Sequence, residues 1–219
     1  MSTSLWAATR TFFPLFFETV QREPTISSVA VVGAADGKFV APLAKAGYEV
    51  TAVDVNGSAL FGTDGASSGQ PEEAYDSGGL AGLVRQARLE DRVTIIEGDV
   101  RELEVPPCDA VWTSCSWHYS LNHDQPLDVF IDALTRCVKH SGILGAEYFM
   151  PVSAAHVASE HYLEQGAIWS YLAGWSPTWD AYTPAFVEQP HLAQPRPHIH
   201  RMGFVVARRR GRESDDMIR

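Results

Sequence analysis

The stretch from Ser27 to Asn56 constrains the fold more than any other part of the sequence. It reads SSVAVVGAADGKFVAPLAKAGYEVTAVDVN: an apolar run, a glycine-bearing turn, apolar residues at helical spacing, and a second apolar run with an acid. This order predicts two parallel strands joined by a helical crossover, and ligands of such sheets bind where the strands end. The stretch therefore predicts the start of a nucleotide-binding α/β domain.

Strands and helices continue to alternate after this unit. Further strands are expected at 92–100, 108–116 and 143–151, further helices at 80–91, 126–142 and 160–175, and two closing strands at TWDAYTPAFVEQ and HIHRMGFVVARR. The two closing strands are joined by the proline-rich PHLAQPRP and predict an antiparallel hairpin. We predict an α/β fold with a Rossmann-like, mostly parallel seven-stranded sheet, helices on both faces and a C-terminal antiparallel hairpin.

One domain is expected over residues 1–210, because 219 residues suit a single α/β unit. Residues 1–24 predict an amphipathic helix that packs on the domain or forms a lid over a pocket. Residues 211–219 predict a polar tail, and the Gly/Ser-rich 57–79 predicts a loop on the ligand side.

The formal net charge of −10 disfavours a nucleic-acid partner, since an acidic surface repels phosphates. No stretch is apolar over enough residues to predict a membrane span. The three cysteines form no CxxC pair and are odd in number, which favours a cytoplasmic protein over a disulfide scaffold.

Three features at strand ends predict an adenosine site. Gly33 and Gly37 permit a tight turn and a close approach to a ligand. Asp54 follows the second strand and can accept hydrogen bonds from both ribose hydroxyls. Asp99 follows the third strand and can accept from an adenine amino group, while the N–H of Val100 meets a ring nitrogen.

With these features in place, the sequence resembles the class I S-adenosylmethionine (SAM)-dependent methyltransferases. VVGAADGKF, VTAVDV, VTIIEGDV, CDAVWTSCSWHYS and GILGAEYFMP follow that family's successive motifs in order and spacing. The closing part, YLEQGAIWSYLAGW…HIHRMGFVVARR, is similar to the small tellurite-resistance-type and thiopurine-type members. Val31 stands where the family usually has an acid, and Ala35 where it usually has a second glycine. Asp36 is the candidate to replace the missing acid.

The resemblance implies a SAM-dependent transfer of a methyl group to a small-molecule acceptor, by in-line displacement at the sulfonium methyl. The expected cofactor is therefore SAM. The expected cofactor-binding residues come from the ends of the first four strands: Gly33, Ala34, Asp36, Gly37, Asp54, Val55, Asp99, Val100, Ser114 and Cys115. Carbonyls of Ser114 and Cys115 would receive the amine of the cofactor. Cys115 itself is interpreted as a small buried residue, because the sequence offers it neither a base nor an oxyanion site.

The acceptor side is expected after the fourth and fifth strands. His118 is the first candidate for a general base, because its unperturbed pKa lies near neutrality, and Tyr119 is the second catalytic candidate. The expected substrate-binding residues are Trp117, Glu147, Tyr148, Trp169 and His200. A base is required only if the attacking atom carries a proton, since methyl transfer depends largely on positioning.

Other functions remain open on the same fold. One is a cyclase in which the amine of SAM attacks its own carbon chain and methylthioadenosine leaves. Another is a non-catalytic SAM-binding protein. An NAD-dependent oxidoreductase is disfavoured, because the first turn lacks the middle glycine of a dinucleotide fingerprint.

A metal site is considered and not expected. His198 and His200 lie on one face of a strand, and His191 lies close in sequence. Zinc requires a third ligand and usually an outer acid, and the sequence does not identify them.

Overall fold

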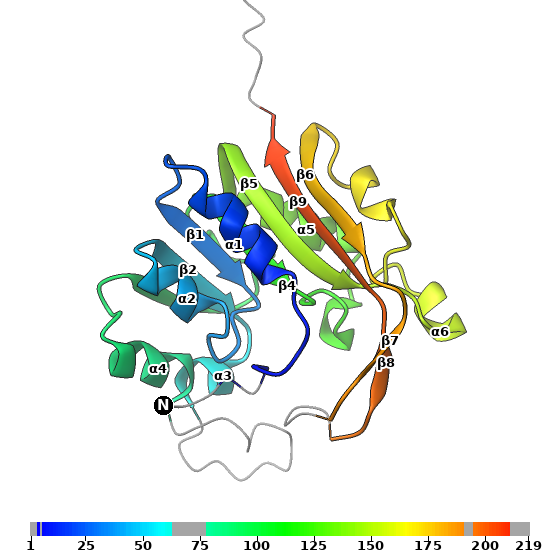
Figure 1. Cartoon of the computed structure of the whole chain (residues 1–219), viewed down its shortest axis with the longest axis horizontal. Helices are drawn as coiled ribbons and strands as arrows, with labels where there is room; N and C mark the ends of the chain where they lie inside the picture. Colours follow the sequence, from blue (N-terminus) through cyan, green and yellow to red (C-terminus); the bar gives the residue numbers. More distant parts are fainter. Residues whose placement is uncertain (1–3, 5, 63–77, 191–194, 211–219) are drawn as a thin grey trace, which may run out of the picture.

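The computed structural model describes residues 4, 6–62, 78–190 and 195–210. Its main sheet has seven strands in the order β3-β2-β1-β4-β5-β9-β6 (Figure 1). The strands are β1 (Ser28–Val32), β2 (Glu49–Asp54), β3 (Val93–Glu97), β4 (Cys108–Ser114), β5 (Val138–Phe149), β6 (Trp175–Tyr182) and β9 (Met202–Arg209). Strands β1 to β5 pair in parallel, and β9 is antiparallel to β5 and β6. The predicted Rossmann-like sheet is confirmed.

Helices cover both faces of this sheet, as predicted. They are α1 (Phe13–Gln21), α2 (Val40–Lys45), α3 (Gly57–Phe61), α4 (Gly79–Ala87), α5 (Leu127–Arg136) and α6 (Ala154–Val157). Alternation along β1 sends Val29 and Val31 into a core with α1, α2 and α4, and Ala30 and Val32 into a core with α5. Two apolar layers therefore hold the strand ends that form the site.

Helix α1 packs on one sheet face rather than over a pocket (Figure 1). Phe13 and Phe16 contact the indole of Trp112 with ring centroids 5.4 and 4.9 Å apart. Gly145 of β5 allows this approach, because a Cβ there would lie 2.3 Å from the Phe16 ring. The helix is thus part of the core. A lid formed by the residues before it stays a prediction.

Two expected helices are corrected. The helix predicted over 126–142 ends at Arg136, and β5 already begins at Val138. The stretch 160–175 contains only the 3₁₀ turn Ala167–Ser170, preceded by the short α6 outside that stretch. Gly166 and Gly174 adopt φ of 81° and 82° there, which interrupts helical geometry.

The predicted closing hairpin is present, with one addition. Beyond the antiparallel pair β6–β9, strands β7 (Phe186–Glu188) and β8 (His198–His200) form a separate two-stranded ribbon that projects past the carboxyl edge of the sheet (Figure 1). Of the expected 57–79 loop, α3 occupies Gly57–Phe61, and 63–77 lie outside the described residues. Among the helices the structure describes, none has both the length and the apolar character needed to cross a membrane.

Candidate active site

A cavity of about 790 Å³ lies at the carboxyl ends of β1 to β5. Of the ten expected cofactor residues, all but Asp36 and Gly37 line it: Gly33, Ala34, Asp54, Val55, Asp99, Val100, Ser114 and Cys115. They converge because the carboxyl ends of parallel strands meet at one edge of a sheet. The structure therefore brings four separate loops to one cavity.

The turn after β1 is a tight, left-handed loop. Gly33 has φ of 74°, and a Cβ there would lie 3.0 Å from the side chain of Ser116. Ala35 also has a positive φ, of 44°, which costs roughly 1–2 kcal/mol for a residue with a Cβ. Its N–H donates to Asp54 Oδ2 at 2.8 Å, and this bond holds the turn.

Asp54 organises the loops on both sides of it. Oδ2 accepts from Ala35 and Oδ1 accepts from the N–H of Asn56 at 2.9 Å. Burial raises the pKa of the Asp54 carboxyl, and the hydrogen bonds from Asn56 and Ala35 counter part of that rise. The carboxylate is thus oriented toward the cavity before any ligand arrives.

Asp99 is held by a neighbour that the sequence interpretation did not include. Arg101 binds both carboxylate oxygens through Nε and Nη2, at 2.6 to 3.0 Å, and its Nη1 reaches Asp124 at 3.1 Å. Burial would raise the pKa of Asp99, but the bonds from Arg101 hold it below its ordinary value. Asp99 is therefore an ionised acceptor of fixed orientation.

Two expected cofactor residues do not line the cavity. Asp36 is buried and accepts from Ser4 Oγ at 2.6 Å, so it anchors the N-terminal segment. Gly37 has φ of 94°, and a Cβ there would lie 2.6 Å from Leu80 of α4. The absence of a side chain at Gly37 therefore lets Leu80 of α4 pack against this turn.

Some of the expected acceptor residues line the cavity and others do not. His118, Tyr119, Glu147 and His200 line the cavity. Trp117 and Tyr148 do not: both are buried in the α5-side core and stack with centroids 5.6 Å apart. Tyr148 follows Glu147 on β5, and strand alternation sends the two side chains to opposite faces.

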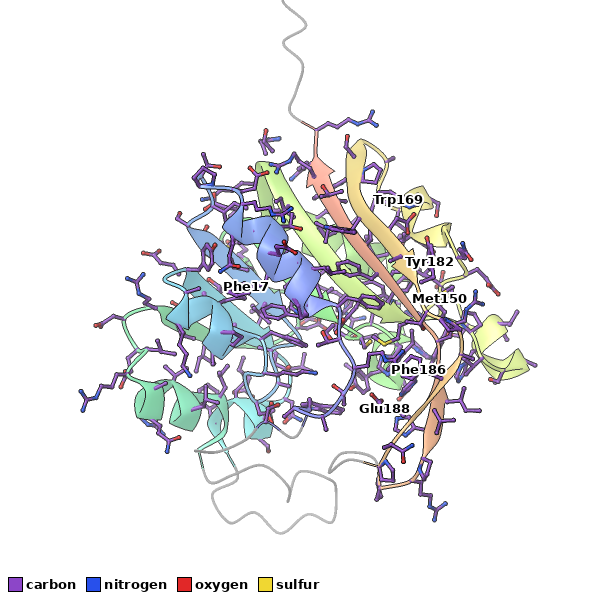
Figure 2. All side chains as sticks on the ribbon, viewed as in Figure 1. Phe17, Met150, Trp169, Tyr182, Phe186 and Glu188 are labelled. Carbon is purple, nitrogen blue, oxygen red and sulfur yellow. The ribbon has the colours of Figure 1, made fainter. Side chains whose placement is uncertain are left out.

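Trp169 is also placed away from the cavity. Its Nε1 donates to Asp180 of β6 at 2.8 Å, and its ring packs against the α5-side core. Figure 2 shows it beside β6, well separated from Glu188 on the ribbon. Trp169 therefore stabilises the strand rather than facing a ligand.

Glu147 is a buried anchor at the cavity edge. Its carboxylate accepts from Thr11 Oγ1 at 2.9 Å, from the N–H of Phe12 at 2.6 Å and from Ser114 Oγ. Burial raises its pKa, while these donors oppose the rise. The carboxylate joins the chain before α1 to the end of β4.

The segment before α1 forms one wall of the cavity. Trp6, Thr9 and Arg10 line it, and Lys38 donates from Nζ to the carbonyl and Oγ1 of Thr9 at 3.1 and 2.7 Å. Burial lowers the pKa of Lys38. Sequence reasoning missed these residues, because their contacts join distant segments, as between Thr9 and Lys38 and between Arg10 and Glu188.

His118 lies in an aromatic part of the wall, with its ring 4.6 Å from Phe149 and 4.2 Å from Tyr119. Burial lowers its pKa to about 4, and the charges of His200, His123 and His156 act in the same direction. The imidazole is therefore neutral at pH 7. A base with such a low pKa is a weak proton acceptor near neutral pH. The low pKa of His118 therefore favours a hydrogen-bonding role over that of a general base.

Cys115, which the sequence interpretation took as a small buried residue, is half-buried in the wall of the cavity. Burial raises its pKa well above the ordinary value, and the charges of Glu147 and Glu188 add to that rise. Its φ of 48° is stabilised by its N–H, which donates to the carbonyl of Glu147 at 2.7 Å.

Solved structures share this fold. TehB from Haemophilus influenzae aligns with a TM-score of 0.63 at 10% identity, covering 94% of this chain and 64% of that one. The YcgJ protein from Bacillus subtilis aligns at 0.62 and 11%, covering 90% and 97%. Magnesium protoporphyrin IX methyltransferase from Synechocystis, solved with bound SAM, aligns at 0.59 and 15%, covering 94% and 88%. A comparison with curated protein sequences finds no match.

The sequence comparison gives the family directly. Residues 30–146, more than half of the chain, match the family model described as a methyltransferase domain. The matched range runs from β1 to β5 and contains the turn at Gly33 and the two acids Asp54 and Asp99. The chain belongs to the class I SAM-dependent methyltransferase family, whose cofactor is S-adenosylmethionine.

Proposed function

We propose that this protein transfers a methyl group from SAM to a small-molecule acceptor. The observation that carries the proposal is that the loops after β1 to β4, the segment before α1 and the β7–β8 ribbon all line one cavity. Its volume of about 790 Å³ falls in the range of small-molecule sites, roughly 300–1,000 Å³. The N-terminal segment and the β7–β8 ribbon both line it, so a polymeric acceptor has little room.

The lining residues suit SAM. Asp54 would accept from the ribose hydroxyls and Asp99 from the adenine amino group, since both carboxylates face the cavity and are already oriented. Gly33 leaves space for the cofactor at the first turn, and Ser114 and Cys115 would receive its amine. When bound, SAM supplies an electrophilic methyl carbon.

The rest of the chain would position the acceptor and exclude water. The side chains that form an aromatic part of the cavity wall around His118 are Tyr119, Phe149 and Tyr162. Neutral His118 would accept a hydrogen bond from an O–H or N–H of the acceptor. Holding the attacking atom in line with the methyl carbon supplies much of the rate in such a reaction.

Calorimetric titration with SAM tests the cofactor half of the proposal. The wild type should bind SAM and not NAD, and Asp54→Ala should weaken SAM binding about 100-fold, since hydrogen bonds to charged groups contribute roughly 1.5–3 kcal/mol each. Asp91→Ala removes an exposed carboxylate and is the matched control. Equal SAM affinity in Asp54→Ala and wild type would contradict the assignment.

Mass spectrometry of the products tests the reaction. Incubation with SAM and a library of small hydroxyl, thiol and amine compounds should release S-adenosylhomocysteine and a proton, together with one compound in which a methyl group has replaced that proton. Release of methylthioadenosine from SAM alone would instead establish the cyclase. Binding of SAM without any product across the library would favour a non-catalytic protein.

A further inference from the structure

The β7–β8 ribbon carries three metal-ligating side chains on one face. Strand pairing places Glu188 opposite His198 and Phe186 opposite His200, so alternation brings Glu188, His198 and His200 to the same side. Val187 and Ile199 point the other way and are exposed. All three ligand side chains line the cavity, and Figure 2 shows Glu188 on the ribbon.

The three ligand atoms converge on a common point. Glu188 Oε2 lies 3.2 Å from Nε2 of His198 and 3.2 Å from Nε2 of His200, and the ligand atoms of all three residues lie within 4.8 Å of one another. Ligand atoms around a tetrahedral zinc ion, at about 2.0–2.1 Å from the metal, lie roughly 3.3 Å apart. The two distances from Glu188 therefore match the spacing of neighbouring ligand atoms around such a metal.

The hydrogen bond on the far side of the His198 ring points in the same direction. Nδ1 lies 2.9 Å from the carbonyl of Arg196, and a carbonyl can only accept, so Nδ1 donates this bond. The opposite ring nitrogen, Nε2, faces Glu188 Oε2 at 3.2 Å. A metal-bound histidine typically donates its other N–H to a carbonyl in this way.

Neighbouring groups hold the other two ligands. The N–H of Arg10 donates to Glu188 Oε1 at 3.2 Å, which leaves Oε2 toward the histidines. The His200 ring stacks on Phe149 with centroids 4.0 Å apart and planes within 6°. The three side chains are thus oriented by contacts from three different segments.

We propose that Glu188, His198 and His200 bind a divalent transition metal of borderline softness, such as Zn²⁺, at the edge of the cavity. Three protein ligands of nitrogen and oxygen type leave a coordination position open, as in catalytic zinc sites. If the proposed methyl transfer holds, that position accepts an oxygen or sulfur of the acceptor and lowers its pKa. This role rests on the proposed function, whereas the metal site does not.

Cobalt and zinc titrations of the full-length, chelator-treated protein test the site. Co²⁺ should bind one equivalent with visible absorption bands of a low-coordinate site, and Zn²⁺ should displace it. His198→Ala and Glu188→Gln should each weaken metal binding at least tenfold, in line with the roughly 10–100-fold losses seen even for outer-shell changes. His140→Ala removes an exposed histidine on β5 and should leave binding unchanged.

Thermal unfolding and SAM titration of the same samples separate the possible failures. Zn²⁺ should raise the melting temperature of the wild type and not of His198→Ala, because a ligand stabilises the state that binds it. Equal metal affinity in wild type and His198→Ala, or no Co²⁺ spectrum at pH 7.5, would overturn the metal site. Metal binding without SAM binding would reject the proposed function and leave the site standing.

Discussion

The two halves of the cavity are built in different ways. The cofactor half comes from loops that directly follow β1 to β4, within residues 33–116. The half where the proposed acceptor would lie, called the acceptor half, combines residues 6–10, 118–122, 147–162, Glu188 and 198–202, which are far apart in the chain. A loop at a strand end is positioned by its own strand, whereas the acceptor half depends on how distant segments dock. Binding residues are therefore readable from local motifs in the first half and not in the second.

Removing the carboxylate that joins the two halves has the largest expected effect. Glu147→Ala leaves the donors of Thr11, Phe12 and Ser114 without their acceptor and should destabilise the protein by about 4 kcal/mol, at roughly 1–3 kcal/mol per donor. Chemical denaturation measures this loss.

Limited proteolysis adds a local test of Glu147. The segment before α1 should become cleavable in Glu147→Ala under native conditions, while Glu164→Ala, an exposed glutamate, should match the wild type. Unchanged stability and unchanged cleavage would show that the N-terminal wall is held by other contacts.

The second effect concerns pH and His118. Its pKa is about 4 in the native protein and 6.5 in its ordinary state, so between these values the unfolded chain binds a proton that the native protein does not. Stability should therefore fall as pH falls from 6.5 to 4, by about 1.4 kcal/mol per pH unit and about 3 kcal/mol in all for this group.

Urea denaturation over this pH window measures the contribution. His118→Gln should flatten the pH dependence of stability by that amount, and His140→Gln, at an exposed position, should leave it as in the wild type. If His118→Gln shows the wild-type slope, His118 is not the buried neutral ring described above.

The smallest expected effect concerns the strained turn after β1, in the cofactor half, where Ala35 has a positive φ. Ala35→Gly should stabilise the protein by about 0.5–1 kcal/mol, because glycine relieves the left-handed φ of 44° but adds entropy to the unfolded chain. Melting temperatures should rise by roughly 1–4 °C.

The neighbouring alanine provides the control for that measurement. Ala34 is buried and does not share the positive φ, so Ala34→Gly should destabilise by about 1 kcal/mol. Stabilisation by both changes, or by neither, would mean that the φ of Ala35 is not the source of strain.

The C-terminal third shows where sequence patterns lose information. Gly166 and Gly174 interrupt a segment whose apolar spacing indicated a helix. Its apolar residues Leu163, Ile168 and Leu172 reach the core from turns and not from one face of a helix. His198 and Glu188 pair across two strands that a proline-rich connection joins. The length of that connection leaves the strand register undetermined by the sequence. The pattern HIH was visible in the sequence, and its acidic partner was not.

Strand alternation also decided single residues near the end of β5. Glu147 and Tyr148 are adjacent, yet one faces the cavity and the other fills the core. In the turn after β4, His118 lines the cavity and Trp117 is buried. Both tryptophans expected near the acceptor, Trp117 and Trp169, pack in the core or beside it. Large apolar rings move to the available buried volume, since that burial lowers the free energy more than contact with a solvent-filled cavity.

The sequence by itself determined the parallel sheet, the order of its motifs, the family and the acids that follow β2 and β3. These features are local, because hydrophobic period, turn residues and strand-end acids act over a few positions. Only the tertiary structure decided which side chains face the cavity, that Arg101 orients Asp99, and that Glu188 meets two histidines. Those contacts depend on register and docking between distant segments, which local patterns do not encode.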